Sequence, residues 1–524
     1  TVTAQYETHA TADVSMSTEF AGGSVTGTLL LDRYSSDGYD LFEDRIGQTV
    51  PGFVDYTASG RLTLRASDRT KFRASGRFGR LDQKDEIGLS FVAGSAPTAS
   101  IGERTEWNAA TGLETNVGDR IRIDGSVYVS RFISTTALVE EDSRFAQLYG
   151  ESEIKADAVI GSNQLLTVGL GASREAVEAD RVVGGRQTAE AGFAYLQHQW
   201  TPSKSLNMVV SGRFDHHTDY SDRVSPKFSL LYKPIAALHV RGSVGSGFKA
   251  PTFQQRYLDF RNPIGGYSVF GASGVGDALR LLEEQGELRR LSGPTVPGDL
   301  LKPEHSWSFN VGVDVLPSAE FELRVNAFRN RISDLIETIL VAEQANGQQV
   351  FSYANLDRIR TQGIELNIGY SPTSPLRFDV GYQFLDSADL DVLEALDAGT
   401  VFKRVDGRDV RVRPAEYGGL FQRSRHSASV NVRYRREALR LTTSLRGTFR
   451  SRYGLFDRNG NLILDDDSEY VAGYSLWNVT ATHEISPRVS VRVGARNLFD
   501  HTNPELIPAL SGRLIFAGVE VRTN

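Results

Sequence analysis

The feature that most restricts the fold of this chain is an alternation of apolar and polar residues that returns along most of its length. In 61–66 (RLTLRA) every second residue is apolar, and after the polar stretch 67–70 (SDRT) the alternation resumes over 71–78. The same pattern is found at 121–129, 321–327 and 439–450. Successive side chains of a strand point to opposite faces, so each run predicts a strand with one apolar face. Repeated runs predict an all-β protein built from hairpins.

The length and number of these runs favour a membrane barrel over a soluble sandwich. A sandwich explains any single half-buried strand, but 524 residues would require several separate cores. The runs reach about ten residues, which is the length that crosses a bilayer when a strand is tilted. No run of about 18 apolar residues is present, so no transmembrane helix is expected. In a barrel every second residue faces the lumen, which explains a mean hydropathy of only −0.29.

Connections between the runs alternate between short and long. Ten short segments rich in Gly, Pro, Asn, Asp and Ser predict tight turns, at 21–23, 67–70, 116–119, 161–164, 201–204, 233–236, 316–319, 371–375, 436–438 and 486–488. Eleven longer intervals, centred near 9, 45, 92, 140, 180, 219, 275, 342, 405, 460 and 503, predict loops. The sequence therefore predicts a transmembrane antiparallel β-barrel of about 22 strands, with short periplasmic turns and long extracellular loops.

The stretch 241–257 (RGSVGSGFKAPTFQQRY) is predicted to be the outward end of about the thirteenth strand, where it opens into the longest loop. Within this loop, 277–291 (DALRLLEEQGELRRL) has the apolar spacing of a short amphipathic helix, although Gly286 weakens that prediction. Aromatic and arginine side chains around the loop are candidate solute contacts: Arg256, Tyr257, Phe260, Arg261, Tyr267 and Phe270. The alternative is that these side chains only fold the loop onto itself.

Composition and motifs exclude several functional classes. The chain has no cysteine, so disulfides, thiol nucleophiles and cysteine-ligated metals are excluded. A net charge of −7 argues against nucleic acid as a partner. No H-E-x-x-H, Walker A or G-x-S-x-G motif is present, which predicts that the protein is not an enzyme.

Two groups of charged residues suggest ligands other than lipid. Asp457, Asn459, Asp465, Asp466 and Asp467 supply enough oxygen atoms for a calcium site in an extracellular loop. The alternative is a solvated hairpin tip with Asn-Gly turn chemistry. A series of lumen-facing arginines could attract an anionic iron chelate or could pair with acidic residues of the barrel and of its contents: Arg73, Arg77, Arg324, Arg433, Arg435, Arg440, Arg446 and Arg450.

An ordered set of short motifs resembles the barrel domain of TonB-dependent outer-membrane receptors, which import ferric siderophores, cobalamin and similar scarce solutes. The motifs are 195–197 (YLQ), 212–215 (GRFD), 225–227 (SPK), 247–252 (GFKAPT), 301–306 (LKPEHS), 363–365 (GIE) and 493–500 (VGARNLFD). They span about the last two thirds of the chain. The resemblance implies a bacterial outer-membrane location, a surrounding lipid bilayer, a small-molecule solute, and a plug domain driven by the TonB system of the inner membrane.

Thr1 already lies at the expected first strand, so residues 1–524 are expected to form the barrel domain, with the plug absent from this chain. A plug is then expected in the same gene product or as a separate polypeptide. The alternative function is that of a barrel without a plug, which serves as a structural scaffold, a secretion gate or an interaction partner in a larger outer-membrane assembly.

Overall fold

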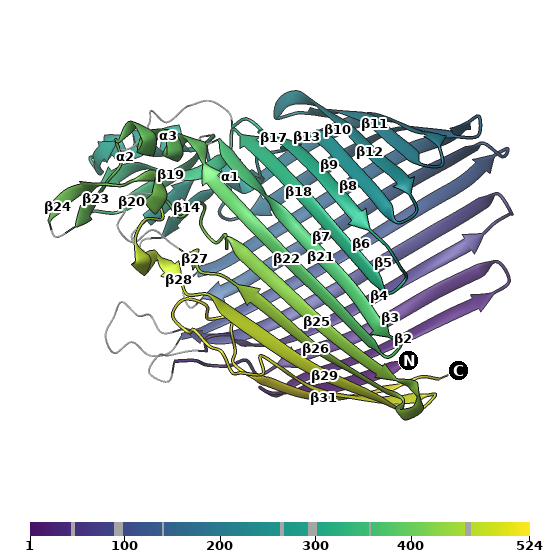
Figure 1. The fold of residues 1–524 in the computed structure, drawn as a ribbon. Helices are drawn as coiled ribbons and strands as arrows, with labels where there is room; N and C mark the ends of the chain where they lie inside the picture. Colours follow the sequence, from purple (N-terminus) through teal and green to yellow (C-terminus); the bar gives the residue numbers. More distant parts are fainter. Residues whose placement is uncertain are drawn as a thin grey trace.

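A closed ring of 22 antiparallel strands forms the body of the protein in the computed structural model (Figure 1). The structure describes residues 1–42, 48–87, 98–138, 141–262, 267–291, 301–355, 358–405, 407–455 and 463–523. The ring closes where β1 (Val2–Glu7) pairs with β31 (Leu514–Val521), so that Val2 lies opposite Val521. Within these residues, no helix is long and apolar enough to cross a membrane.

The barrel strands follow the chain in order around the ring. Between β1 and β31 they are β2 (Thr11–Gly22), β3 (Val25–Ser36), β4 (Gly52–Arg65), β5 (Thr70–Ile87), β6 (Thr98–Val117), β7 (Ile121–Leu138), β8 (Glu141–Ile160), β9 (Gln164–Ala179), β10 (Arg186–Ser203), β11 (Leu206–His217), β12 (Tyr220–Ile235), β13 (Leu238–Lys249), β17 (Glu304–Val315), β18 (Phe321–Ser333), β21 (Ile359–Thr373), β22 (Leu376–Asp389), β25 (His426–Arg436), β26 (Leu441–Arg450), β29 (Tyr474–Ser486) and β30 (Val489–Arg496). The ten predicted turns and eleven predicted loops all join consecutive strands of this ring. One turn contains the 3₁₀ helix η2 (Glu437–Leu439).

The register of the first long hairpin shows why alternation produces this fold. Residues directly opposite each other on paired strands share a face of the sheet. Leu64 of β4 lies opposite Phe72 of β5, and Thr63 lies opposite Arg73. Leu62, Leu64 and Phe72 are all exposed, on the outer face of the barrel. The polar residues of the same strands therefore face the lumen.

The largest loop folds together with its neighbour, and the two loops form what we call the roof sheet. The first loop supplies α1 (Phe253–Tyr257), β14 (Asp259–Asn262), β15 (Tyr267–Phe270), α2 (Val275–Glu284) and β16 (Leu288–Leu291), and the second supplies β19 (Ile336–Gln344) and β20 (Gln349–Asn355). The strand order is β14-β15-β20-β19-β16. In Figure 1 the helices gather at one end of the barrel, and both chain termini lie towards the other end.

The predicted helix at 277–291 is only partly correct. The observed helix α2 ends at Glu284, and Gly286 adopts a positive φ of 70° that no helix continues. The following residues form β16, which pairs with β19 from the other loop. Leu282 packs as expected, in a buried cluster with Phe270 and Val341.

Two further loops form a second folded group on the same end. The first contains α3 (Leu390–Ala398), β23 (Phe402–Val405), β24 (Arg408–Arg411) and the 3₁₀ helix η1 (Pro414–Glu416). The second contains β27 (Tyr453–Gly454), the 3₁₀ helix η3 (Asp467–Glu469) and β28 (Tyr470–Val471). Leu396, Val412 and Ile463 form the buried cluster that joins them. The three hydrophobic clusters of the described residues all lie in loops, because the barrel wall turns its apolar side chains outwards, away from the lumen.

Candidate functional site

The six predicted solute contacts all lie in the roof sheet or in α1 beside it. Phe260 on β14 meets Tyr267 on β15 edge to face, with ring centroids 5.8 Å apart. The guanidinium of Arg261 lies 5.3 Å from the ring centroid of Phe270, and that of Arg181 lies 4.7 Å from the ring of Phe260. The fold therefore gathers aromatic rings and cations around the β14–β15 hairpin, with Arg181 contributed by the β9–β10 loop, a combination suited to stacking against a planar or polar solute.

Helix α1 is held in place by charge and by capping. Thr252 and Gln255 form a reciprocal capping box at its first turn. Arg256, only 6% exposed, forms an ion pair with Asp219 at the tip of the β11–β12 hairpin. Its guanidinium also lies 4.7 Å from the ring centroid of Tyr257. Burial raises the pKa of the Tyr257 hydroxyl above its usual value.

The six predicted solute contacts differ in how far their side chains are buried within the loop. Arg256 and Phe270 are buried and build the loop, whereas Arg261 keeps about half of its side chain exposed. Tyr257, Phe260 and Tyr267 are half-buried. Contact between a solute and any of these six residues stays a prediction.

The inner wall of the barrel carries a polar cavity of about 1060 Å³. Its lining comes from β1, β2, β18, β21, β22, β25, β26, β29, β30 and β31. The charged residues among them are Asp13, Glu322, Arg324, Asp379, Arg433, Arg446, Arg492 and Arg496. Arginine thus outnumbers acid on this wall.

The arginines predicted to face the lumen differ in how they are neutralised. Arg73 pairs with Glu114, Arg77 lies 3.5 Å from Glu106, and Arg324 lies 2.9 Å from Glu322. Arg433 and Arg446 have no acidic partner among the described residues. Arg492, which the sequence analysis did not single out, also has no acidic partner among the described residues. Its only signal is the alternation in 489–496 (VSVRVGAR), where the arginines fall on the lumen side.

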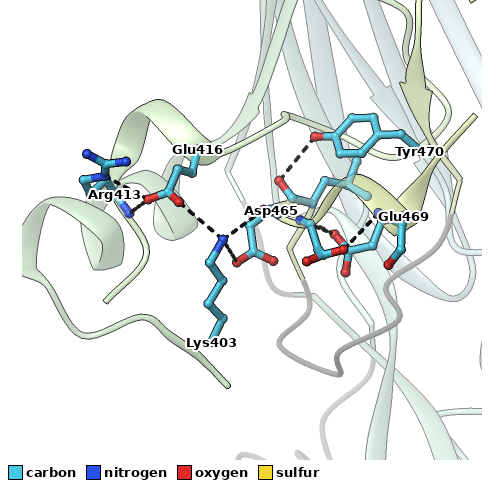
Figure 2. A network of polar contacts seen from close by, with 9 residues as sticks. Lys403, Arg413, Glu416, Asp465, Glu469 and Tyr470 are labelled. Atoms are coloured by element: carbon cyan, nitrogen blue, oxygen red, sulfur yellow. Dashed lines mark hydrogen bonds and ion pairs between the residues drawn. The ribbon is translucent and has the colours of Figure 1, made fainter. Parts of the chain in front are cut away.

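The two loops of the second group are tied together by a polar network around Lys403 (Figure 2). The Nζ of Lys403 lies 3.3 Å from Glu416 and donates to the backbone carbonyl of Asp465 at 3.2 Å. Backbone and side-chain hydrogen bonds from Arg413 lower the pKa of Glu416 to about 2. Burial acts to lower the pKa of Lys403, but its contacts with Glu416 and Asp465 raise it overall. The network therefore keeps Lys403 and Glu416 of the first loop oppositely charged at neutral pH, and Lys403 also contacts Asp465 of the second loop.

The residues predicted to bind calcium fall in this same region. Asp457 and Asn459 lie outside the described residues. Asp465 lies 3.6 Å from Lys403, Asp466 accepts a hydrogen bond from the Ser468 amide, and Asp467 pairs with Arg452. Within the described part of the chain, no three acidic or histidine side chains gather as a metal site. The calcium site stays a prediction.

Comparison with known proteins identifies the family. The family model described as TonB dependent receptor-like, beta-barrel matches residues 5–498. The vitamin B12 transporter BtuB of Photobacterium profundum is 22% identical over 91% of this chain and 66% of its own length. An iron-regulated outer membrane virulence protein of Vibrio cholerae is 22% identical over 38% of this chain and 28% of its own length. The chain thus spans less than two thirds of either curated relative.

The fold is shared with solved receptors of low sequence identity. The siderophore receptor PirA of Pseudomonas aeruginosa superposes with a TM-score of 0.69 at 14% identity, over 99% of this chain and 79% of that one. The closed 22-stranded ring and these relatives place the protein in the bacterial outer membrane. The chain belongs to the TonB dependent receptor-like, beta-barrel family, a family of receptors and transporters rather than of enzymes.

Proposed function

We propose that the protein is the barrel of an active importer, which captures a scarce solute outside the cell and passes it through its lumen. The solute class is that of the relatives, a ferric siderophore or cobalamin. Transport is driven by the TonB system through a plug domain that occupies the lumen.

The observation that carries this proposal is the polar cavity on the wall of a closed lumen, below folded outer loops. Its volume of about 1060 Å³ is at the upper end of the range for ligand pockets. The roof sheet at the outer end supplies rings and cations for the first contact, in particular Arg261 and the Phe260–Tyr267 pair. A solute can therefore be captured by the roof sheet and then meet polar groups inside.

Uptake measurements test the proposal directly. Labelled cobalamin and a panel of labelled ferric siderophores are offered to a strain that lacks this protein and to the same strain with the gene restored. We expect restored, energy-dependent uptake of one solute class. Equal uptake by both strains for every solute, together with open-pore conductance of the purified protein in planar bilayers, would refute the importer function and favour a scaffold or secretion gate.

A matched pair of variants tests the capture site. Arg261→Ala removes an exposed cation from the aromatic hairpin, whereas Arg290→Ala removes one from β16, away from that hairpin. We expect the first variant to raise the apparent KM for uptake several-fold without changing the maximal rate, and the second to change neither. An unchanged KM in Arg261→Ala would show that the β14–β15 hairpin does not take part in capturing the solute.

A further inference from the structure

Three arginines lie on the outer face of the barrel, near the strand ends that carry the long loops. Phe309 and Trp307 of β17 are exposed on this face. The register places Arg329 and Arg331 of β18 opposite these two rings, in that order. Residues directly opposite each other on paired strands share a face, so both arginines point away from the lumen. Arg360 of β21 lies directly opposite Arg331, on the other side of β18. We call the three arginines the outer basic patch.

The outer basic patch has one acidic neighbour on its own face. Along β17, β18, β21 and β22, all within the described residues, Asp386 of β22 is the only acid among the residues that face outwards. Its carboxylate lies 3.1 Å from Arg360 and accepts a hydrogen bond from Gln362 at 3.0 Å. Arg329 and Arg331 are exposed and form no ion pair within the described part of the chain. Three cations against one carboxylate leave the patch with a net charge of +2.

This arrangement of charges is unfavourable without an anion. The Cβ atoms of directly opposite residues are about 4.5–5.5 Å apart, and like charges at such positions destabilise a sheet. Arg331 and Arg360 form a pair of this kind. By contrast, Arg174 on the outer face of β9 lies 3.6 Å from Glu190, directly opposite on β10. An anion bound between Arg331 and Arg360 would remove their repulsion.

The height of the patch is that of the lipid head groups on the outer side of the membrane. The apolar belt of an outer-membrane barrel is about 25 Å tall and has aromatic residues at both edges. Phe321 and Tyr370 form an aromatic pair at the turn end of β18 and β21, with ring centroids 6.3 Å apart. From Phe321 to Arg331 the strand advances ten residues, which at about 3.3 Å each and a tilt of about 40° gives a rise of about 25 Å. Arg331 and Trp307 therefore lie at the outer edge of the belt.

The net charge of the patch favours a phosphate monoester over other lipid head groups. A phosphate monoester carries about −1.5 to −2 charges at neutral pH, and arginine binds its oxygens through paired N–H donors. One such group balances the patch. A phosphodiester, as in phosphatidylglycerol, has a single ionisable oxygen and would leave part of the patch unbalanced. Phosphate monoesters are borne by lipid A, the glucosamine disaccharide lipid of the outer leaflet.

We propose that the outer basic patch binds a phosphate monoester on the head group of an outer-leaflet glycolipid of the lipid A class. Arg329 and Arg331 donate to the phosphate oxygens, and Arg360 is shared between the phosphate and Asp386. The acyl chains run down the outer face from the exposed ring of Trp307. The inference goes beyond the importer proposal and does not rest on it, because the patch faces away from the lumen.

Native mass spectrometry measures this binding on the full gene product, purified in a neutral detergent and freed of co-purified lipid. The probes are lipid A, the same lipid with its phosphate groups removed, phosphatidylglycerol and inorganic phosphate. We expect lipid A to bind in preference to the other three. Each arginine near an anionic lipid surface contributes a factor of about five, so the double variant Arg329→Gln with Arg331→Gln should bind lipid A about 30-fold more weakly.

Two single variants serve as controls, and heat-modifiable gel mobility confirms the folding of each. Arg131→Gln removes another exposed arginine of the outer face, which lies opposite Trp107 on one side but opposite Leu148 rather than an arginine on the other. It should leave the binding of lipid A unchanged. Asp386→Asn raises the charge of the patch and should tighten binding about five-fold, a gain that a loss of structure would not produce.

Several results would overturn the proposal. One is equal binding of lipid A by the wild type and the double variant, and another is equal binding of lipid A with and without its phosphate groups, or of phosphatidylglycerol. Inorganic phosphate that displaces lipid A at equal concentration would assign the patch to a free anion instead. A dimer of the wild type that the double variant does not form, with lipid binding unchanged, would assign it to a contact between two copies of the chain.

Discussion

The ion pair between Arg256 and Asp219 allows a quantitative prediction about how the roof sheet is anchored. Substitution Asp219→Asn keeps the shape of the side chain and removes its charge. The side chain of Arg256 is 7% exposed and that of Asp219 is 16% exposed, so the pair is largely shielded from water. Removing one partner of a buried pair costs about 3–5 kcal/mol, because the other charge is left uncompensated.

The lower end of that range applies, because Arg256 also lies over the ring of Tyr257 and the amide oxygen introduced by the substitution can still accept a hydrogen bond. A loss of about 3 kcal/mol corresponds to a change of about 100-fold in the opening equilibrium, at 1.36 kcal/mol for each factor of ten. The opening is local, since the barrel strands do not depend on this contact.

Hydrogen exchange measures the effect at the amides of α1. We expect protection of 253–257 to fall by about 100-fold in Asp219→Asn, and trypsin cleavage after Arg256 to rise in parallel. Asp222→Asn is the matched control, because Asp222 pairs with His216 while half exposed and should change protection little. The double variant Asp219→Asn with Arg256→Met also removes the guanidinium charge that the single variant leaves without a partner, and should recover most of the protection. Protection within threefold of the wild type in Asp219→Asn would refute the reasoning.

Three further predictions concern the second loop group and the barrel wall. Leu396→Ala, at a fully buried position, should lower the local stability of α3 by about 2–5 kcal/mol by hydrogen exchange, whereas the exposed Val405→Ala should have little effect. Hydrogen bonds from Arg413, and then the contact with Lys403, lower the pKa of Glu416 to about 2, so the stability they contribute is fully present above its unfolded pKa of about 4.3 and is lost as pH falls towards 2. Pepsin cleavage in 401–417 should rise over that window, and Glu416→Gln should abolish the pH dependence while leaving the cleavage high. Gly363→Ala places a methyl group 2.0 Å from the carbonyl oxygen of Phe384, so heat-modifiable gel mobility should show a loss of folded barrel; Gly212→Ala, with open space around it, should fold normally.

The barrel was predictable from the sequence because lipid and lumen impose the same alternation on every strand. A one-residue slip would turn Leu62 and Leu64 into the lumen and Arg61 and Arg65 into lipid, so the register is strongly determined. The turns were predictable for a similar reason, since Gly22 and Gly23 or Pro375 favour a turn whatever surrounds them.

The loops were less predictable because their partners are distant in sequence. The apolar spacing of 277–291 fits a helix, but the last residues pair with β19, about fifty positions away. The acidic run at 465–467 fits a calcium loop by local spacing, yet Asp465 meets Lys403, which lies 62 positions earlier. Likewise, nothing near Arg256 in the sequence indicates that Asp219 is its partner.

The pairing of the roof sheet determines which pieces of the protein can be exchanged. β15 of the first loop pairs in parallel with β20 of the second, and β16 pairs with β19, so strands from each loop complete the sheet of the other. A graft of either loop alone from a relative would leave unpaired strand edges and half of a hydrophobic cluster exposed. An exchange of the outer surface with a relative should therefore keep β14–β16 and β19–β20 together, because the strands of each loop pair with those of the other.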